Sequence, residues 1–93
     1  MSYALSGSQA SYLPSSNGFS FAGGTLQGWL RAPSGMTGKV ILEKYAKNRW
    51  SAVYTSNTGN LIDVSYSAAS ATYRWNVQIV SGSGSYTFYG KPN

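Results

Sequence analysis

The sequence predicts an all-β fold: a small antiparallel β-sandwich, jelly-roll-like, with about seven or eight strands. Large and polar residues alternate in short runs, and Gly, Pro and Asn interrupt these runs at roughly the 8–12-residue spacing of such folds. Helix-favouring runs are almost absent, because Gly, Ser and β-branched or aromatic residues recur every few positions. A chain of 93 residues predicts one domain, spanning residues 1–93.

The first 18 residues are the least regular part of the chain. They are rich in Ser and contain a proline and an Asn-Gly turn, so residues 1–18 are expected as a loosely ordered N-terminal arm or an edge strand. The strand would lie around residues 3–5 or around residues 12–13. A brief strand at 19–21 follows and ends before the paired glycines at 23–24.

The rest of the chain predicts six further strands separated by turns. Two runs flanking the dipeptide at 47–48 are expected to form a hairpin, and an antiparallel sheet with one dry face explains the period-2 pattern. The expected strands are 25–32, 39–46, 49–55, 61–67, 72–80 and 86–90.

The strand at 72–80 shows the alternation most clearly. A one-residue slip in its register would bury Arg74, so the register should be firm. Each large apolar residue contributes roughly 1.5–3 kcal/mol when buried, which favours a central place in a sheet. The expected core face carries Tyr73, Trp75, Val77 and Ile79, extended by Tyr86 and Phe88, and the opposite face carries Arg74, Asn76 and Gln78.

The sequence lacks some of the residue types that most often carry out catalysis or bind metal ions. The chain has no Cys and no His, which removes disulfides, thiolates and imidazoles. Glu43 and Asp63 are its two carboxylates, the minimum for glycoside hydrolysis. An acid alone in a strand more often forms a surface salt bridge, and Glu43 has Lys39, Lys44 or Arg49 within reach. No enzyme, metal site or cofactor is therefore expected.

The net charge of +5 favours an anionic partner such as an envelope polymer or lipid headgroups. The cations are spread along the sequence and do not form the dense stripe that nucleic-acid binding needs, so a nucleic-acid partner is not favoured. No apolar stretch is long enough to predict a transmembrane segment. The run "KYAKNRW" gathers a basic patch of Lys44, Lys47 and Arg49 near a hairpin tip. Interleaved with aromatics, it suits an anionic glycan, a headgroup or single-stranded nucleic acid, and the alternative is a solvated tip.

Aromatic residues form 15% of the chain, more than so small a core holds. Exposed rings beside amide and guanidinium groups stack on sugars while the polar groups bond the hydroxyls. Two alternatives stand beside this interpretation: half-buried strand residues with a structural role, or an interface between copies, so an oligomer is possible. The candidate ligand-binding residues are Trp29, Arg31, Tyr45, Trp50, Tyr54, Asn76 and Tyr89.

Three segments carry a family resemblance: "GKVILEKYAKNRW", "ATYRWNVQI" and the closing "GSGSYTFYG". In this order they resemble the bacterial pre-peptidase C-terminal domain, a secreted jelly-roll-like β-sandwich. The resemblance implies a non-catalytic accessory module of an exported bacterial protein. The acidic residues that often accompany such domains are missing here, which puts a calcium role in doubt. The first residues lack the pattern of a signal peptide, so either the protein is not exported or Met1 is an expression start before a mature chain. The composition, with few charges and many uncharged polar residues, favours the second alternative and a secreted chain.

Together these observations predict a non-catalytic extracellular module that binds a glycan or cell-envelope polymer through exposed aromatic and basic residues. A small basic secreted effector, toxin or antimicrobial acting on anionic envelopes is the first alternative. A structural or self-assembling β-protein is the second.

Overall fold

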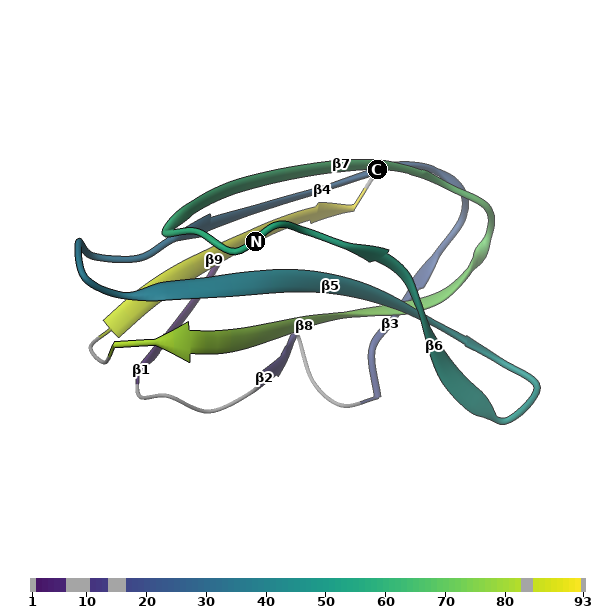
Figure 1. The fold of residues 1–93 in the computed structure, drawn as a ribbon. Coiled ribbons are helices and arrows are strands. Elements are labelled where there is room, and N and C mark those ends of the chain that lie inside the picture. Colours follow the sequence, from purple (N-terminus) through teal and green to yellow (C-terminus); the bar gives the residue numbers. More distant parts are fainter. Residues whose placement is uncertain (1, 7–10, 14–16, 83–84, 93) are drawn as a thin grey trace.

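A computed structural model of the chain describes residues 2–6, 11–13, 17–82 and 85–92, with the backbone alone described at 2–6, 11–13, 85 and 89–92. In this part of the chain every regular element is a strand, and no helix has the length and apolar character needed to cross a membrane. The strands are β1 (Ser2–Ser6), β2 (Ser11–Leu13), β3 (Phe19–Phe21), β4 (Gly24–Arg31), β5 (Thr37–Ala46), β6 (Arg49–Thr55), β7 (Leu61–Ala68), β8 (Ala71–Ser81) and β9 (Ser85–Pro92) (Figure 1).

The strands form two antiparallel sheets that face each other. One sheet has the order β1-β9-β4-β7, and the other has the order β2-β8-β5-β6 with β3 also paired to β8. Since β2 and β3 pair with successive parts of β8, they share one strand position, and each sheet then has four positions. The chain crosses between the sheets at most of its connections, as in a jelly roll. The predicted all-β antiparallel sandwich is confirmed, and both candidate N-terminal strands form.

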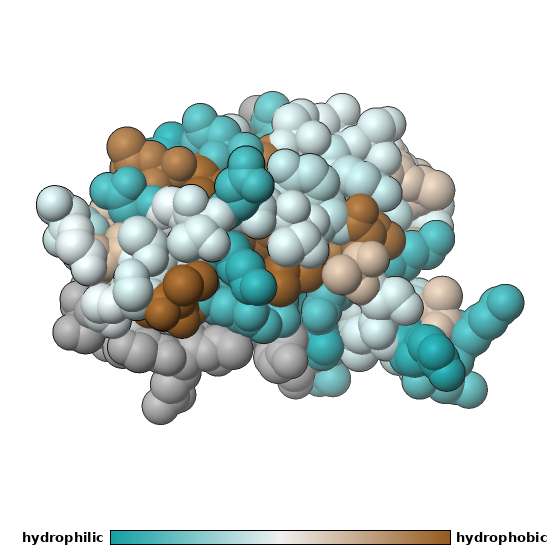
Figure 2. Space-filling model, in the orientation of Figure 1, coloured by the Kyte–Doolittle hydropathy of each residue, from teal (hydrophilic) through white to brown (hydrophobic). Residues whose placement is uncertain are grey.

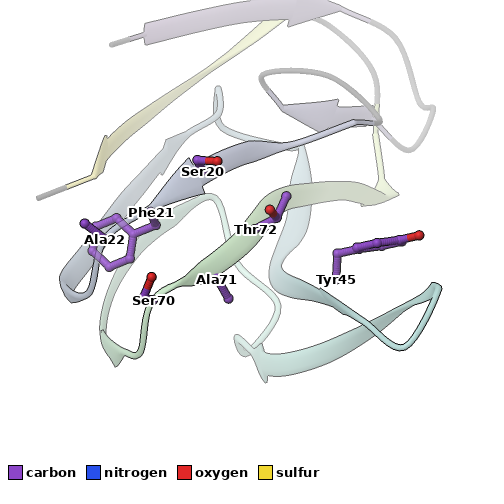
Figure 3. Close-up of a pocket in the computed structure, with 7 residues that line it drawn as sticks. All are labelled: Ser20, Phe21, Ala22, Tyr45, Ser70, Ala71 and Thr72. Carbon is purple, nitrogen blue, oxygen red and sulfur yellow. The ribbon is translucent and has the colours of Figure 1, made fainter.

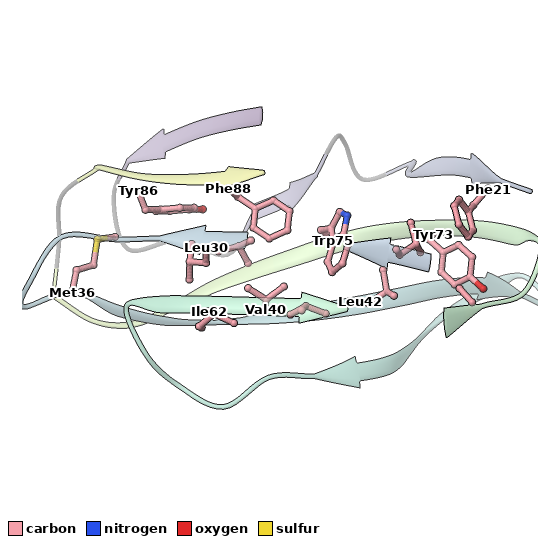
Figure 4. Close-up of a cluster of buried hydrophobic side chains, with 14 residues drawn as sticks. Phe21, Leu30, Met36, Val40, Leu42, Ile62, Tyr73, Trp75, Tyr86 and Phe88 are labelled. Carbon is pink, nitrogen blue, oxygen red and sulfur yellow. The ribbon is translucent and has the colours of Figure 1, made fainter. Parts of the chain in front are cut away.

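The core lies between the two sheets and follows the predicted alternation. Residues of β8 and β9 that share the expected core face are buried, and Ile79 is partly buried at the end of that row. Figure 4 shows the core as one row of side chains, from Met36 and Tyr86 at one end to Phe21 and Tyr73 at the other. The predicted core face of residues 72–80 and 86–90 is therefore confirmed at Tyr73, Trp75, Val77, Tyr86 and Phe88.

The centre of this core depends on the absence of a side chain at Gly28. Trp75 of β8 and Phe88 of β9 pack there with their ring centroids 5.2 Å apart. A Cβ atom on Gly28 would lie 2.8 Å from the Phe88 ring and 3.0 Å from the Trp75 ring. A glycine in β4 thus makes room for the two aromatic rings that join the sheets.

The β5–β6 hairpin extends past one end of the sandwich (Figure 1). Its turn consists of Lys47 and Asn48, which have φ angles of 53° and 63°, as two-residue turns of type I′ require. The hairpin predicted around 47–48 is therefore confirmed. A bulge between Leu42 and Glu43 shifts the register against β6, so the pairing passes from Tyr54 to Ala52. This bulge decides which side chains of β6 face outward.

Candidate functional site

Tyr45 and Trp50 form an aromatic pair on the outer face of the β2-β8-β5-β6 sheet. The two residues are direct partners in the β5–β6 register, so their side chains lie on the same face. Their ring centroids are 5.1 Å apart with an interplanar angle of 57°. Tyr45 is 42% exposed, and its hydroxyl lies 3.5 Å from the Asn48 Oδ1 atom. The sequence placed these two aromatics near a hairpin tip, and the structure brings them into contact.

Trp50 is held in place by Arg74 of β8 and by the backbone at Gly18. The Arg74 guanidinium lies 4.2 Å from the centroid of the Trp50 ring, within the range of a cation–π contact. Arg74 Nε donates a hydrogen bond of 2.5 Å to Glu43 Oε1, and both side chains are largely buried, with 12% and 15% exposed. On another side the backbone of Gly18 approaches so closely that a Cβ there would lie 2.8 Å from the indole. The prediction that Glu43 forms a salt bridge with Lys39, Lys44 or Arg49 is wrong. Glu43 pairs with Arg74, which is its cross-strand neighbour in β8.

Two hollows adjoin at Tyr45 and Thr72, at the end of the sheet where the hairpin projects. Figure 3 shows the larger one, where the Tyr45 ring stands on one side and the hydroxyls of Ser20 and Thr72 lie on neighbouring strands. The larger hollow has a volume of about 590 Å³ and is lined by Ser20, Phe21, Ala22, Tyr45, Ser70, Ala71 and Thr72. The smaller hollow has a volume of about 340 Å³ and is lined by Asn17, Tyr45, Trp50 and Thr72. Both volumes lie within the range of roughly 300–1,000 Å³ that is typical of small-molecule sites.

The lining of these hollows, together called the aromatic hollow below, combines ring surface with hydroxyl and amide groups. Among the described residues, no charged side chain lines either part. Sequence analysis did not identify its polar members, because Ser and Thr are too frequent in this chain to stand out. Their positions depend on pairing between distant segments: Ser20 of β3 is the register partner of Thr72 in β8. The missed polar residues are Asn17, Ser20, Ser70 and Thr72.

The basic patch lies on a different face from the aromatic pair. Lys44 and Arg49 alternate along the hairpin with Tyr45 and Trp50, so they point to the opposite side of the sheet, while Lys47 lies in the turn. Within the described ranges no carboxylate pairs with these three cations, since Glu43 binds Arg74 and Asp63 binds Arg31. Figure 2 shows hydrophilic side chains gathered at the projecting hairpin. The cations and aromatic residues that alternate in the hairpin sequence therefore lie on opposite faces of the sheet.

Three further predicted site residues belong to the other sheet. Trp29 and Arg31 lie on the outer face of β4, because Leu30 between them is buried. Tyr89 is the register partner of Trp29 in β9, but its side chain lies outside the described residues. Arg31 forms a salt bridge of 2.8 Å with Asp63 and donates a hydrogen bond to its neighbour's carbonyl. These residues are not brought together with Tyr45 and Trp50.

Asn76 and Tyr54 differ from their expected surroundings. The expectation that Asn76 is exposed is wrong: it is 4% exposed, because β2 pairs alongside it and its amide lies 3.5 Å from Glu43 Oε2. Tyr54 is 37% exposed, but the bulge turns it away from the face of Trp50. Its ring instead lies 6.3 Å from that of Tyr66 in β7.

The two carboxylates lie on opposite sides of the molecule. Glu43 faces outward from β5 and Asp63 faces outward from β7, which belong to different sheets. Each is paired with an arginine. The described part of the chain contains no group of three residues able to hold a metal ion. The arrangement does not bring two acids to one substrate bond, as glycoside hydrolysis needs.

No family model matches the chain. Its structure is similar to the crystal structure of the mitogen derived from Yersinia pseudotuberculosis, with a TM-score of 0.74 and 15% sequence identity. The match covers 100% of this chain and 85% of that chain. At this identity the likeness shows a shared fold, in agreement with the small β-rich domain described above. The resemblance to the pre-peptidase C-terminal domain stays a prediction.

Proposed function

We propose that this protein is a non-catalytic module that binds a glycan in the aromatic hollow. The observation that supports this most is the exposed ring of Tyr45, which stands where two adjoining hollows meet. Aromatic rings stack on the apolar faces of pyranoses, and nearby hydroxyl and amide groups bond the sugar hydroxyls. The lining of the aromatic hollow contains both kinds of group.

The contacts that hold Trp50 and Tyr45 in place favour a binding surface that is already formed before the ligand binds. Trp50 is fixed by Arg74 and by the backbone of Gly18, and Tyr45 packs against Trp50. A ring that is already fixed loses little conformational entropy on binding, so more of the stacking energy appears as affinity. An extracellular location belongs to this proposal, because uncharged polar residues replace most surface charges in this chain.

Calorimetric titration with a panel of soluble oligosaccharides tests the proposal. Tyr45→Ala should weaken binding at least tenfold, since losing a stacked ring costs about 1.4 kcal/mol or more. Tyr54→Ala is the matched control, because Tyr54 is exposed to a similar degree but lies on another face. Equal losses in the two variants, or no binding by any member of the panel, would contradict the proposal.

A second candidate function is action on anionic envelopes, and one observation favours it. The three hairpin cations have no carboxylate partner among the described residues, and both acids of the chain are bound by other arginines. The protein should then bind vesicles of phosphatidylcholine and phosphatidylglycerol, and not vesicles of phosphatidylcholine alone. Binding should fall steeply as salt shortens the Debye length. Replacing Lys44, Lys47 and Arg49 by Gln should abolish it, and unchanged vesicle binding would reject this candidate.

A further inference from the structure

We propose that the ligand of the aromatic hollow is an uncharged oligosaccharide of at least two sugar units, rather than an acidic polymer. This inference rests on the proposed function and names the class of glycan. It runs against the net charge of +5, which by itself favours an anionic partner. The charges of the chain, however, lie away from the hollow.

The described lining of the hollow carries no charged side chain. Its polar side-chain groups are hydroxyls, one amide and the indole N–H of Trp50, all of which are neutral. An acidic sugar bound there would find no counter-charge in the lining, so its carboxylate would gain nothing over its hydration in water. Hydroxyl groups of a neutral sugar can instead form hydrogen bonds with Ser20, Ser70 or Thr72.

Arg74 is the charged residue packed directly behind the aromatic pair. Its guanidinium is covered by the Trp50 ring and is hydrogen-bonded to Glu43, with 12% of its side chain exposed. The two opposite charges largely cancel at the distance of a direct ion pair. Arg74 therefore positions Trp50 and contributes little attraction for an anion in the hollow.

The cations in the two hairpin strands face away from the aromatic hollow. Lys44 and Arg49 point to the face of the sheet opposite to Tyr45 and Trp50. An anionic chain bound to these cations would lie on the far side of the hairpin from the aromatic hollow. The excess positive charge is thus spatially separate from the ring on which a sugar would stack.

The two adjoining parts of the hollow favour a ligand of more than one sugar unit. Tyr45 and Thr72 line both hollows, so a sugar unit at their junction leaves volume for a neighbouring unit in either part. The hydroxyls of Ser20 and Ser70 line the larger part, and Asn17 lines the smaller part. A linear chain would contact both parts, whereas a monosaccharide would fill one.

Calorimetry with size-matched neutral and acidic oligosaccharides tests the inference. The neutral set contains glucose, mannose and N-acetylglucosamine oligomers of one to four units, and the acidic set contains galacturonate and glucuronate oligomers of the same lengths. The best neutral oligomer should bind at least tenfold more tightly than any acidic one. Its affinity should change less than twofold between low and high salt, and should rise at least tenfold from one unit to two.

Variants connect the binding to the hollow. Thr72→Ala should weaken neutral binding, because Thr72 lines both parts, whereas Ser65→Ala on the outer face of β7 should not. The double substitution of Lys44 and Arg49 by Gln should leave the affinity unchanged. Acidic oligomers that bind more tightly, lose affinity in salt and still require Tyr45 would overturn this inference and leave the proposed function intact. Failure of every oligosaccharide to bind would overturn both.

Discussion

Arg74 shows how one residue can hold a surface together without touching a ligand. Its guanidinium contacts the Trp50 ring on β6 and the Glu43 carboxylate on β5, while its own backbone belongs to β8. The side chain therefore joins three adjacent strands behind the aromatic hollow. Because the ion pair is largely buried, removing one partner leaves the other charged and poorly solvated.

Arg74→Met should lower the free energy of unfolding by about 3 kcal/mol, the low end for breaking a buried ion pair. The double substitution Glu43→Leu with Arg74→Met should recover most of that loss, because it leaves no unpaired charge. Urea unfolding of the two single variants and the double variant measures this. A double variant whose loss equals the sum of the single losses would show that the pair does not interact.

Tyr73 gives a prediction about alkaline pH. Burial raises the pKa of the Tyr73 hydroxyl above its ordinary value, and the neighbouring Tyr66 acts in the same direction. The hydroxyl donates a 2.7 Å hydrogen bond to the carbonyl of Ala69. Because the folded state holds this proton more tightly than the unfolded chain, stability is unaffected below the ordinary pKa of about 10 and falls as the pH rises above it.

Tyr73→Phe should therefore be less stable than the parent by about 1 kcal/mol at neutral pH, through loss of the hydrogen bond. Above pH ~10 its stability should fall less steeply than that of the parent, because this proton is no longer linked to folding. Chemical unfolding at several pH values compares the two slopes. Parallel slopes would mean that the Tyr73 proton is not linked to folding.

At the scale of the element, the β5–β6 hairpin depends on two residues with left-handed backbone. Lys47 is poorly suited to this conformation, whereas Asn48 tolerates it. Lys47→Asn should therefore stabilise the protein by up to about 1 kcal/mol, and Asn48→Ala should destabilise it by a similar amount. Thermal unfolding measures both, and changes of the same sign would contradict the assigned turn.

The hairpin also shows how much of the fold and the site could be predicted from the sequence. Alternation and turn residues were enough for the strands, the core face of β8 and the turn at 47–48. The bulge after Leu42 has no residue-type signature, so Tyr54 was grouped with Trp50 although it faces elsewhere. The burial of Asn76 beside β2 and the register pairing of Ser20 with Thr72 both depend on pairing between distant segments, which alternation alone does not specify.

At the scale of the whole molecule, the two sheets meet closely at Gly28. Gly28→Ala would push a methyl group against the Phe88 and Trp75 rings, and overpacking of this kind costs about 1–3 kcal/mol. Gly59→Ala is the matched control, because its added Cβ would meet nothing closer than 3.9 Å. Thermal unfolding should show a clear loss for the first variant and little change for the second. Equal effects would mean that the contact between the sheets is not tight at Gly28.

The different chemistry of the two hairpin faces suggests how the ligand preference of such a module could change during evolution. Neighbouring residues in its two strands present aromatic rings on one side and cations on the other. An insertion of one residue after Leu42 would leave Val40 and Leu42 in the core and would exchange the two sides of the hairpin beyond that point, bringing Lys44 and Arg49 to the hollow. Ligand charge would then change without replacement of any side chain. Among diverged relatives, hairpin length would be a better guide to ligand class than conservation of the individual residues.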